Sequence, residues 1–112
     1  MNDDLMSTLF RDYVREHRDI TFREGSRTLD VFNNWRLSPT TFTFADQGTC
    51  KVEGRATVEV NALDGNGRVS RGEQGFSATV KYHGTSTTSA DSSDVHEYVI
   101  DAIVDNTIIL HR

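Results

Sequence analysis

The stretch that decides the fold is Gly48–Gly84, GTCKVEGRATVEVNALDGNGRVSRGEQGFSATVKYHG. Apolar and polar residues alternate from 50 to 62 and again from 76 to 83, which is typical of strands with one buried and one wet face. Between these runs stands Asp64-Gly65-Asn66-Gly67, a cluster that tolerates positive φ. The stretch therefore predicts one long β-hairpin, with Gly54 marking a bulge or a close backbone approach.

Two segments outside the hairpin have the spacing of amphipathic helices. Residues 3–17 have Asn2, Asp3 and Asp4 available to cap and favour the helix N-terminus, and residues 94–105 begin with Asp94 and Glu97 in a capping-box arrangement. Their apolar positions are Leu5, Met6, Leu9, Phe10, Tyr13 and Val14, and Val95, Val99, Ala102 and Ile103. The predicted fold class is α+β. It is a single domain over 1–112 with an antiparallel sheet of three to five strands, covered on one face by these two helices.

The remaining segments are shorter. Residues 40–45 predict a strand, 85–93 a loop, and 107–110 a last strand or a docked tail. Residues 19–38 fit a strand pair around Glu24-Gly25-Ser26, or a short helix from Ser26 that includes Trp35; the strand pair is favoured. Pro39 is expected to close this segment.

Composition limits the function classes. The chain has 112 residues, a net charge of −5, one cysteine and 36% hydrophobic residues, which suits a globular protein of a reducing compartment without disulfides. No apolar run reaches the roughly 18 residues of a membrane span, and the N-terminus is acidic. We therefore expect a cytoplasmic protein with no membrane partner. The acidic balance argues against direct nucleic-acid binding.

Charge is segregated along the chain. Arg11, Arg15 and Arg18 share one side of the first expected helix, while Asp94, Glu97, Asp101 and Asp105 form a narrow acidic ridge on the last. The free sheet face would display Lys81 and His83 among other polar residues. The expected α-β-β-β-α order is similar to that of the double-stranded RNA-binding domain, but Asp91 and Asp94 stand where lysines would meet phosphate. The candidate partner-binding residues are the three arginines and the four acidic residues of the ridges, together with Lys81 and His83.

The hairpin tip, residues 62–73, resembles a calcium loop of the EF-hand family. Asp64, Asn66 and Ser70 would supply oxygens, Gly67 the sharp turn and Glu73 the closing carboxylate. Two features depart from the family pattern: Ala62 occupies the first ligand position, and strand-like sequence flanks the loop where the family has helices.

No catalytic motif is present. The sequence has no nucleophile elbow, phosphate loop or dinucleotide fingerprint, and Cys50 shares the core-facing parity of its strand. We predict a non-enzymatic protein-protein interaction module without catalytic residues, metal or cofactor, of the type found among viral or phage accessory proteins and inhibitors. Its partner would be another protein or a second copy. The alternatives are a structural subunit of a virion or homo-oligomer, and a ligand- or calcium-binding domain using residues 62–73.

Overall fold

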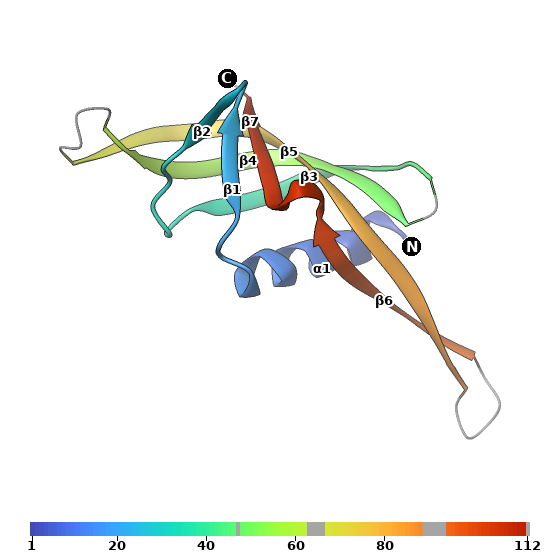
Figure 1. The fold of residues 1–112 in the computed structure, drawn as a ribbon. Coiled ribbons are helices and arrows are strands. Elements are labelled where there is room, and N and C mark those ends of the chain that lie inside the picture. Colours follow the sequence, from blue (N-terminus) through green and yellow to red (C-terminus); the bar gives the residue numbers. More distant parts are fainter. Residues whose placement is uncertain (47, 63–66, 89–93, 112) are drawn as a thin grey trace.

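The protein is built on a seven-stranded mixed sheet with one helix (Figure 1). The computed structural model describes residues 1–46, 48–62, 67–88 and 94–111. The sheet order is β2-β1-β7-β5-β4-β3, with β6 also beside β5; β1 and β7 are parallel and all other pairs are antiparallel. The elements are α1 (Asp3–Glu16), β1 (Thr21–Glu24), β2 (Arg27–Leu29), β3 (Arg36–Phe44), β4 (Thr49–Asn61), β5 (Arg68–Thr88), β6 (Asp94–Ile103), a 3-10 turn η1 (Val104–Asn106) and β7 (Thr107–His111).

The long hairpin is confirmed. Strands β4 and β5 pair from Asn61 opposite Arg68 to Thr49 opposite Lys81. A bulge opposite Val58 contains Gly72 at φ 65°, the left-handed region that glycine enters without steric cost. Gly54 marks a close approach, because a Cβ there would lie 2.1 Å from the carbonyl oxygen of Ser38.

The core lies between α1 and the inner face of the curved sheet (Figure 1). Helix α1 begins as predicted, with the Asn2 side chain accepting from the Leu5 amide at 2.9 Å. Its buried residues are Met6, Phe10 and Val14, and Phe10 stacks on Phe76 of β5 with 6.0 Å between ring centroids. The sheet supplies the rest of the core from alternate positions, including Phe22, Val52, Val58, Val80, Ile108 and Leu110.

The predicted C-terminal helix is wrong, because residues 94–103 form strand β6. A bulge in the pairing with β5 explains the misleading pattern. Lys81 lies opposite Ala102 and Tyr82 opposite Ile100, so Asp101 is an extra residue. Alternation therefore shifts by one, and Ile100 and Ile103 come to the same face three residues apart, as they would on a helix. The β-branched and aromatic residues of this segment favour a strand.

The expected sheet of three to five strands is also too small. The favoured strand pair in 19–38 is confirmed as β1 and β2, with Phe22 opposite Leu29. Pro39 lies inside β3, which pairs only with β4 among the described residues; its missing N–H is tolerated there because β3 is an edge strand. The predicted last strand is confirmed as β7.

Strand β5 extends beyond the body of the protein. Its pairing with β4 ends at Lys81, and residues 82–88 pair with β6 alone. This region, 82–88 of β5 with 94–100 of β6, is called the arm. It projects away from the sheet (Figure 1) and contributes to principal dimensions of 62 × 23 × 21 Å. Residues 85–88 are thus strand, and the rest of the predicted loop, 89–93, lies outside the described residues.

The described part of the hairpin tip belongs mostly to strand β5. Residues 63–66, including Asp64 and Asn66, lie outside the described residues. Arg68 to Glu73 belong to strand β5, where Ser70 lies opposite Glu59 and Glu73 opposite Thr57. Glu73 therefore lies within the β-ladder.

Candidate functional site

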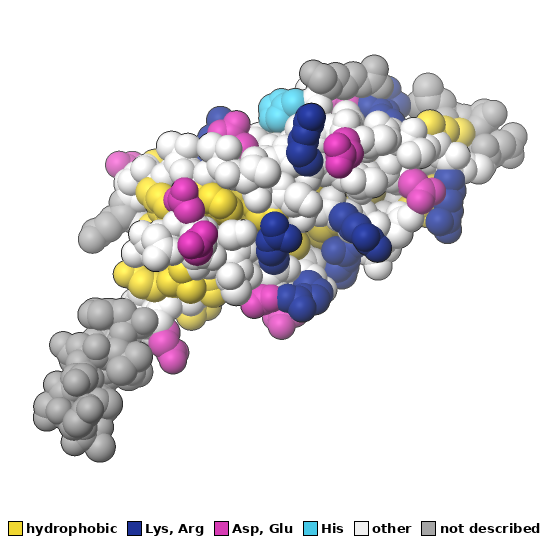
Figure 2. Space-filling view, turned by 180° about the vertical axis from the view of Figure 1, so that it is seen from behind, with side chains coloured by type: hydrophobic (Ala, Val, Ile, Leu, Met, Phe, Trp, Pro, Cys, Tyr) yellow, Lys and Arg dark blue, Asp and Glu magenta, His cyan; other side chains and the backbone are white. Residues whose placement is uncertain are grey.

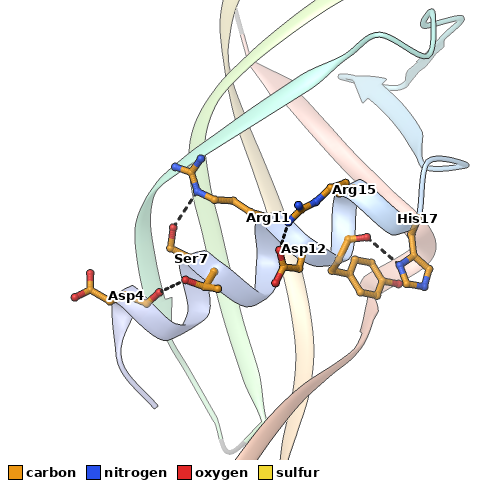
Figure 3. A network of polar contacts seen from close by, with 8 residues as sticks. Asp4, Ser7, Arg11, Asp12, Arg15 and His17 are labelled. Carbon is orange, nitrogen blue, oxygen red and sulfur yellow. Dashed lines mark hydrogen bonds and ion pairs between the residues drawn. The ribbon is translucent and has the colours of Figure 1, made fainter.

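The arginines of α1 line a groove between that helix and the edge strand β3. Four arginines contribute: Arg11 and Arg15 from α1, Arg18 just after its C-cap, and Arg36 from the start of β3. The groove has a volume of about 410 Å³, and its other lining residues are Val14, Trp35, Leu37 and Ser38. We call it the arginine groove. Figure 3 shows Arg11 and Arg15 rising from α1 on the side of the neighbouring strand.

Most of these arginines have no carboxylate partner in the part of the chain that the structure describes. Arg15 pairs with Asp12 one turn back on α1, and the Arg11 Nε donates to Ser7 Oγ at 3.3 Å (Figure 3). Among the described residues, no carboxylate pairs with Arg11, Arg18 or Arg36. Lys and Arg side chains also gather across the middle of the molecule in Figure 2. A protein with a net charge of −5 therefore carries a locally basic site.

Arg18 has a different role from the other three arginines. Its guanidinium lies 3.5 Å from the Trp35 ring centroid and donates to the carbonyl oxygens of Asn33 and Trp35 at 2.9 and 2.8 Å. Trp35 is itself buried and packs edge-on against Phe22. Burial lowers the pKa of Arg18 below its ordinary value. Arg18 thus fixes Trp35 as a wall of the groove.

The four predicted acidic residues do not form a ridge, because the helix that would align them is absent. Asp94 is the first residue of β6, and Glu97 lies exposed on the arm opposite Thr85. Asp101 occupies the bulge, and Asp105 follows in η1 with φ 58°. Three of the four acids remain on one strand, so β6 is acidic without presenting a helical ridge.

Lys81 and His83 are exposed on the outer face of β5, as the alternation predicted. The same face carries Lys51 opposite Thr79 and Glu53 opposite Ser77. The structure brings His83 to Asp101, with 2.7 Å between Nδ1 and Oδ1. It does not bring either residue to the arginine groove. Of the nine predicted residues, the three arginines line the groove, while Asp94, Glu97 and His83 lie on the arm and Lys81, Asp101 and Asp105 lie near its base.

Two features of the surface had no sequence signal. Arg36 joins the groove only because β3 packs beside α1, a contact between residues far apart in sequence. A cleft of about 480 Å³ where the arm leaves the body is lined by Met1, Gly48, Tyr82, His83, Gly84 and Tyr98. Met1 in this lining places the base of the arm near the N-terminal end of α1, whereas the arginine groove lies along its C-terminal half.

The described residues that could act as nucleophiles lack activating partners. Burial, followed by the charge of Asp3, raises the pKa of the Cys50 thiol to about 11, so it is protonated at neutral pH. Ser77 Oγ lies 2.9 Å from His111 Nε2, but no carboxylate among the described residues is hydrogen-bonded to His111. No group of three possible metal ligands occurs in the described part of the chain.

Comparison with known proteins leaves the site to be interpreted from its own geometry. No helix in the described ranges is both long and apolar enough to cross a membrane. No protein-family model matches the chain, and no match was found among curated proteins or solved structures.

Proposed function

We propose that this protein is a non-enzymatic interaction module whose arginine groove binds an acidic, extended segment of a protein partner. The observation that carries the proposal is the convergence of Arg11, Arg15, Arg18 and Arg36 on one groove, where Asp12 is their single carboxylate partner among the described residues. Guanidinium groups bind carboxylates through paired, charge-assisted hydrogen bonds. The apolar lining from Val14, Trp35 and Leu37 suits a segment that also carries apolar side chains.

An extended segment fits the groove because β3 is an edge strand. On one side β3 pairs with β4, and the described residues include no strand on its other side. An added peptide strand could pair with such an edge. Pro39 has no N–H, and the register shifts between Pro39 and Thr41, so regular pairing beside the groove is limited to the first residues of β3. Side-chain charge is therefore expected to provide most of the specificity.

A protein segment fits better than nucleic acid. Binding to a phosphate backbone gains affinity from many cationic contacts, and these extend over several nucleotides. Here the basic site is confined to one groove on a chain with net charge −5. A duplex would bring the acidic side chains of the remaining surface close to phosphate.

The test is isothermal titration calorimetry with two synthetic peptides, one alternating Glu and Val and one alternating Lys and Val. We expect the Glu peptide to bind at low salt, with affinity falling as salt rises, and the Lys peptide not to bind. Arg11→Glu with Arg36→Glu should weaken binding at least about tenfold.

The matched control is Arg23→Glu with Arg27→Glu, which makes the same change in charge on the exposed β1–β2 hairpin at the opposite side of the sheet. This variant should bind the Glu peptide like the native protein. No binding of the Glu peptide, or equal weakening by both double variants, would overturn the proposal.

A further inference from the structure

We propose that the acidic segment that fits the arginine groove is strand β6 in the arm of a second copy of this chain. Copies would then associate head to tail. This inference rests on the proposed function and identifies its partner. Three properties of the arm support it: its two-stranded form, its unprotected edge and its charge.

The arm contacts the body at its base, where the Tyr82 N–H donates to the Gly48 carbonyl oxygen and the Tyr82 ring packs edge-on against Phe44. Beyond Lys81, strand β5 pairs with β6 alone, so the arm is a two-stranded ribbon. Such ribbons are marginally stable in water unless another surface covers them. Val99, on the outer face of the arm, is 46% exposed. Docking against a second copy would add both a neighbouring strand and an apolar contact.

The free edge of β6 lacks the devices that usually prevent strand addition. Natural sheet edges are blunted by short length, lysine, proline or bulges. The edge strand β2 has three residues, and β3 contains Pro39 and a register shift. Strand β6 has ten residues, without lysine or proline, and its bulge lies at Asp101 near the body. Residues 94–100 of β6 therefore form an available edge.

The negative charge of strand β6 determines which surfaces can pair with its free edge. Strand β6 carries Asp94, Glu97 and Asp101 and no Lys or Arg. Two β6 edges would bring like charges together, which disfavours symmetric pairing. The arginine groove has four cations and, among the described residues, one acidic partner, Asp12. The acidic edge and the basic groove are thus complementary.

The positions of the two surfaces determine the form of the assembly. The arm leaves the body beside Met1, and the groove follows the C-terminal half of α1. One copy can therefore use its groove and its arm at once. Such a heterologous contact generates a ring or an open chain of copies, not a closed two-fold dimer.

The experiment is sedimentation velocity on the full chain over a range of concentrations, at low and high salt. The native protein should form species larger than a dimer at low salt, and these should dissociate as salt rises. Both the groove variant, Arg11→Glu with Arg36→Glu, and an arm variant, Glu97→Lys with Asp101→Lys, should be monomeric when alone. The Arg23→Glu, Arg27→Glu control should assemble like the native protein.

Mixing the two variants gives the sharpest result. The groove variant keeps a native arm, and the arm variant keeps a native groove, so one native contact can form between them. The mixture should therefore contain a one-to-one dimer and no larger species. A monomeric native protein, assembly that survives either double variant, or a mixture that stays monomeric would overturn the inference.

Failure of this inference can be separated from failure of the proposed function. The monomeric arm variant has an intact groove and should bind the Glu-Val peptide. If it binds the peptide while the native protein remains monomeric at every concentration, the groove recognises an acidic segment of a different protein. In that case the self-assembly inference fails and the proposed function stands.

Discussion

The two halves of strand β5 show how the same sequence pattern produces two different environments. Residues 75–81 have β4 on one side, β7 or β6 on the other and α1 across the inner face, so Phe76, Ala78 and Val80 are buried. Residues 82–88 continue the strand with β6 as their only paired strand among the described residues, and Tyr82 keeps contacts with Gly48 and Phe44 at the base of the arm. Tyr82, on the same face as Val80, is only half-buried. The difference comes from the number of neighbouring elements and not from local propensity.

The largest contrast is expected from one substitution made in each region. Val58→Asp would place an unpaired carboxylate in the core, where Val58 is 1% exposed, and should lower the free energy of unfolding by at least about 3–5 kcal/mol. Val99→Asp on the arm should change it by less than about 0.5 kcal/mol. Urea unfolding followed by far-UV circular dichroism, at a concentration where the protein is monomeric, measures both. Equal effects would show that the arm belongs to the cooperative core.

Two glycines provide a second matched pair. At Gly54 a Cβ would lie 2.1 Å from the Ser38 carbonyl oxygen and 2.9 Å from the Pro39 Cα. Because backbone must move, Gly54→Ala should cost about 3 kcal/mol. At Gly84 the nearest atom is Cε1 of the Tyr98 ring, at 3.0 Å, and this side chain can shift. Gly84→Ala should therefore cost less than about 1 kcal/mol. Chemical unfolding of both variants tests the difference, and a larger cost at Gly84 would contradict it.

The buried thiol of the body predicts a pH dependence of stability. The folded state raises the pKa of Cys50 from 9.0 to about 11 and so holds the proton more tightly than the unfolded chain. This contribution is full below pH 9 and is lost as the pH rises towards 11, by on the order of 2 kcal/mol. Unfolding curves at pH 8 and pH 10 would show a smaller decline for Cys50→Ala than for the native protein. An identical decline of the unfolding free energy in both proteins would contradict a raised pKa of Cys50 in the folded state.

A small effect is expected from the contact between His83 and Asp101 at the base of the arm. His83 and Asp101 are each about half exposed, at 51% and 47%, so His83→Gln should change the free energy of unfolding by less than about 1 kcal/mol. The body offers a comparison in Arg71 and Glu24, which are 13% and 18% exposed. Arg71→Met should cost about 2 kcal/mol, because it leaves a carboxylate in a partly desolvated site. Thermal unfolding measures the two costs, and the reverse order would contradict this ranking.

The elements that the sequence predicted correctly depend on local patterns. Helix α1 has its cap at Asn2 and its apolar stripe within fourteen residues, and β4 alternates without interruption on its buried face. Strand β6 was mistaken for a helix because the bulge at Asp101 breaks its alternation. Such an extra residue can be recognised only from the pairing with the partner strand, which is β5. Residues 85–88 at the end of β5 were themselves predicted to be a loop.

The candidate site likewise combines residues that a local pattern could group with residues that only tertiary contacts bring together. Arg11, Arg15 and Arg18 could be grouped from the helical period, since the first two lie on α1 and Arg18 follows its C-cap. Arg36 could not be added to them, because the contact between α1 and β3 is tertiary. The acidic residues were correctly seen as concentrated near the C-terminus, but their expected geometry depended on a helix. Their position on a projecting strand changes how a partner would meet them.

The stacking of Arg18 on Trp35 has a practical consequence. Trp35 is the only tryptophan in the chain, and its ring is held 3.5 Å from the Arg18 guanidinium in the wall of the arginine groove. All tryptophan fluorescence of the protein therefore originates at this one place. A peptide or a second copy that enters the groove should alter the emission without any added label, whereas a ligand bound elsewhere should leave it unchanged. The protein thus contains its own optical reporter of groove occupancy.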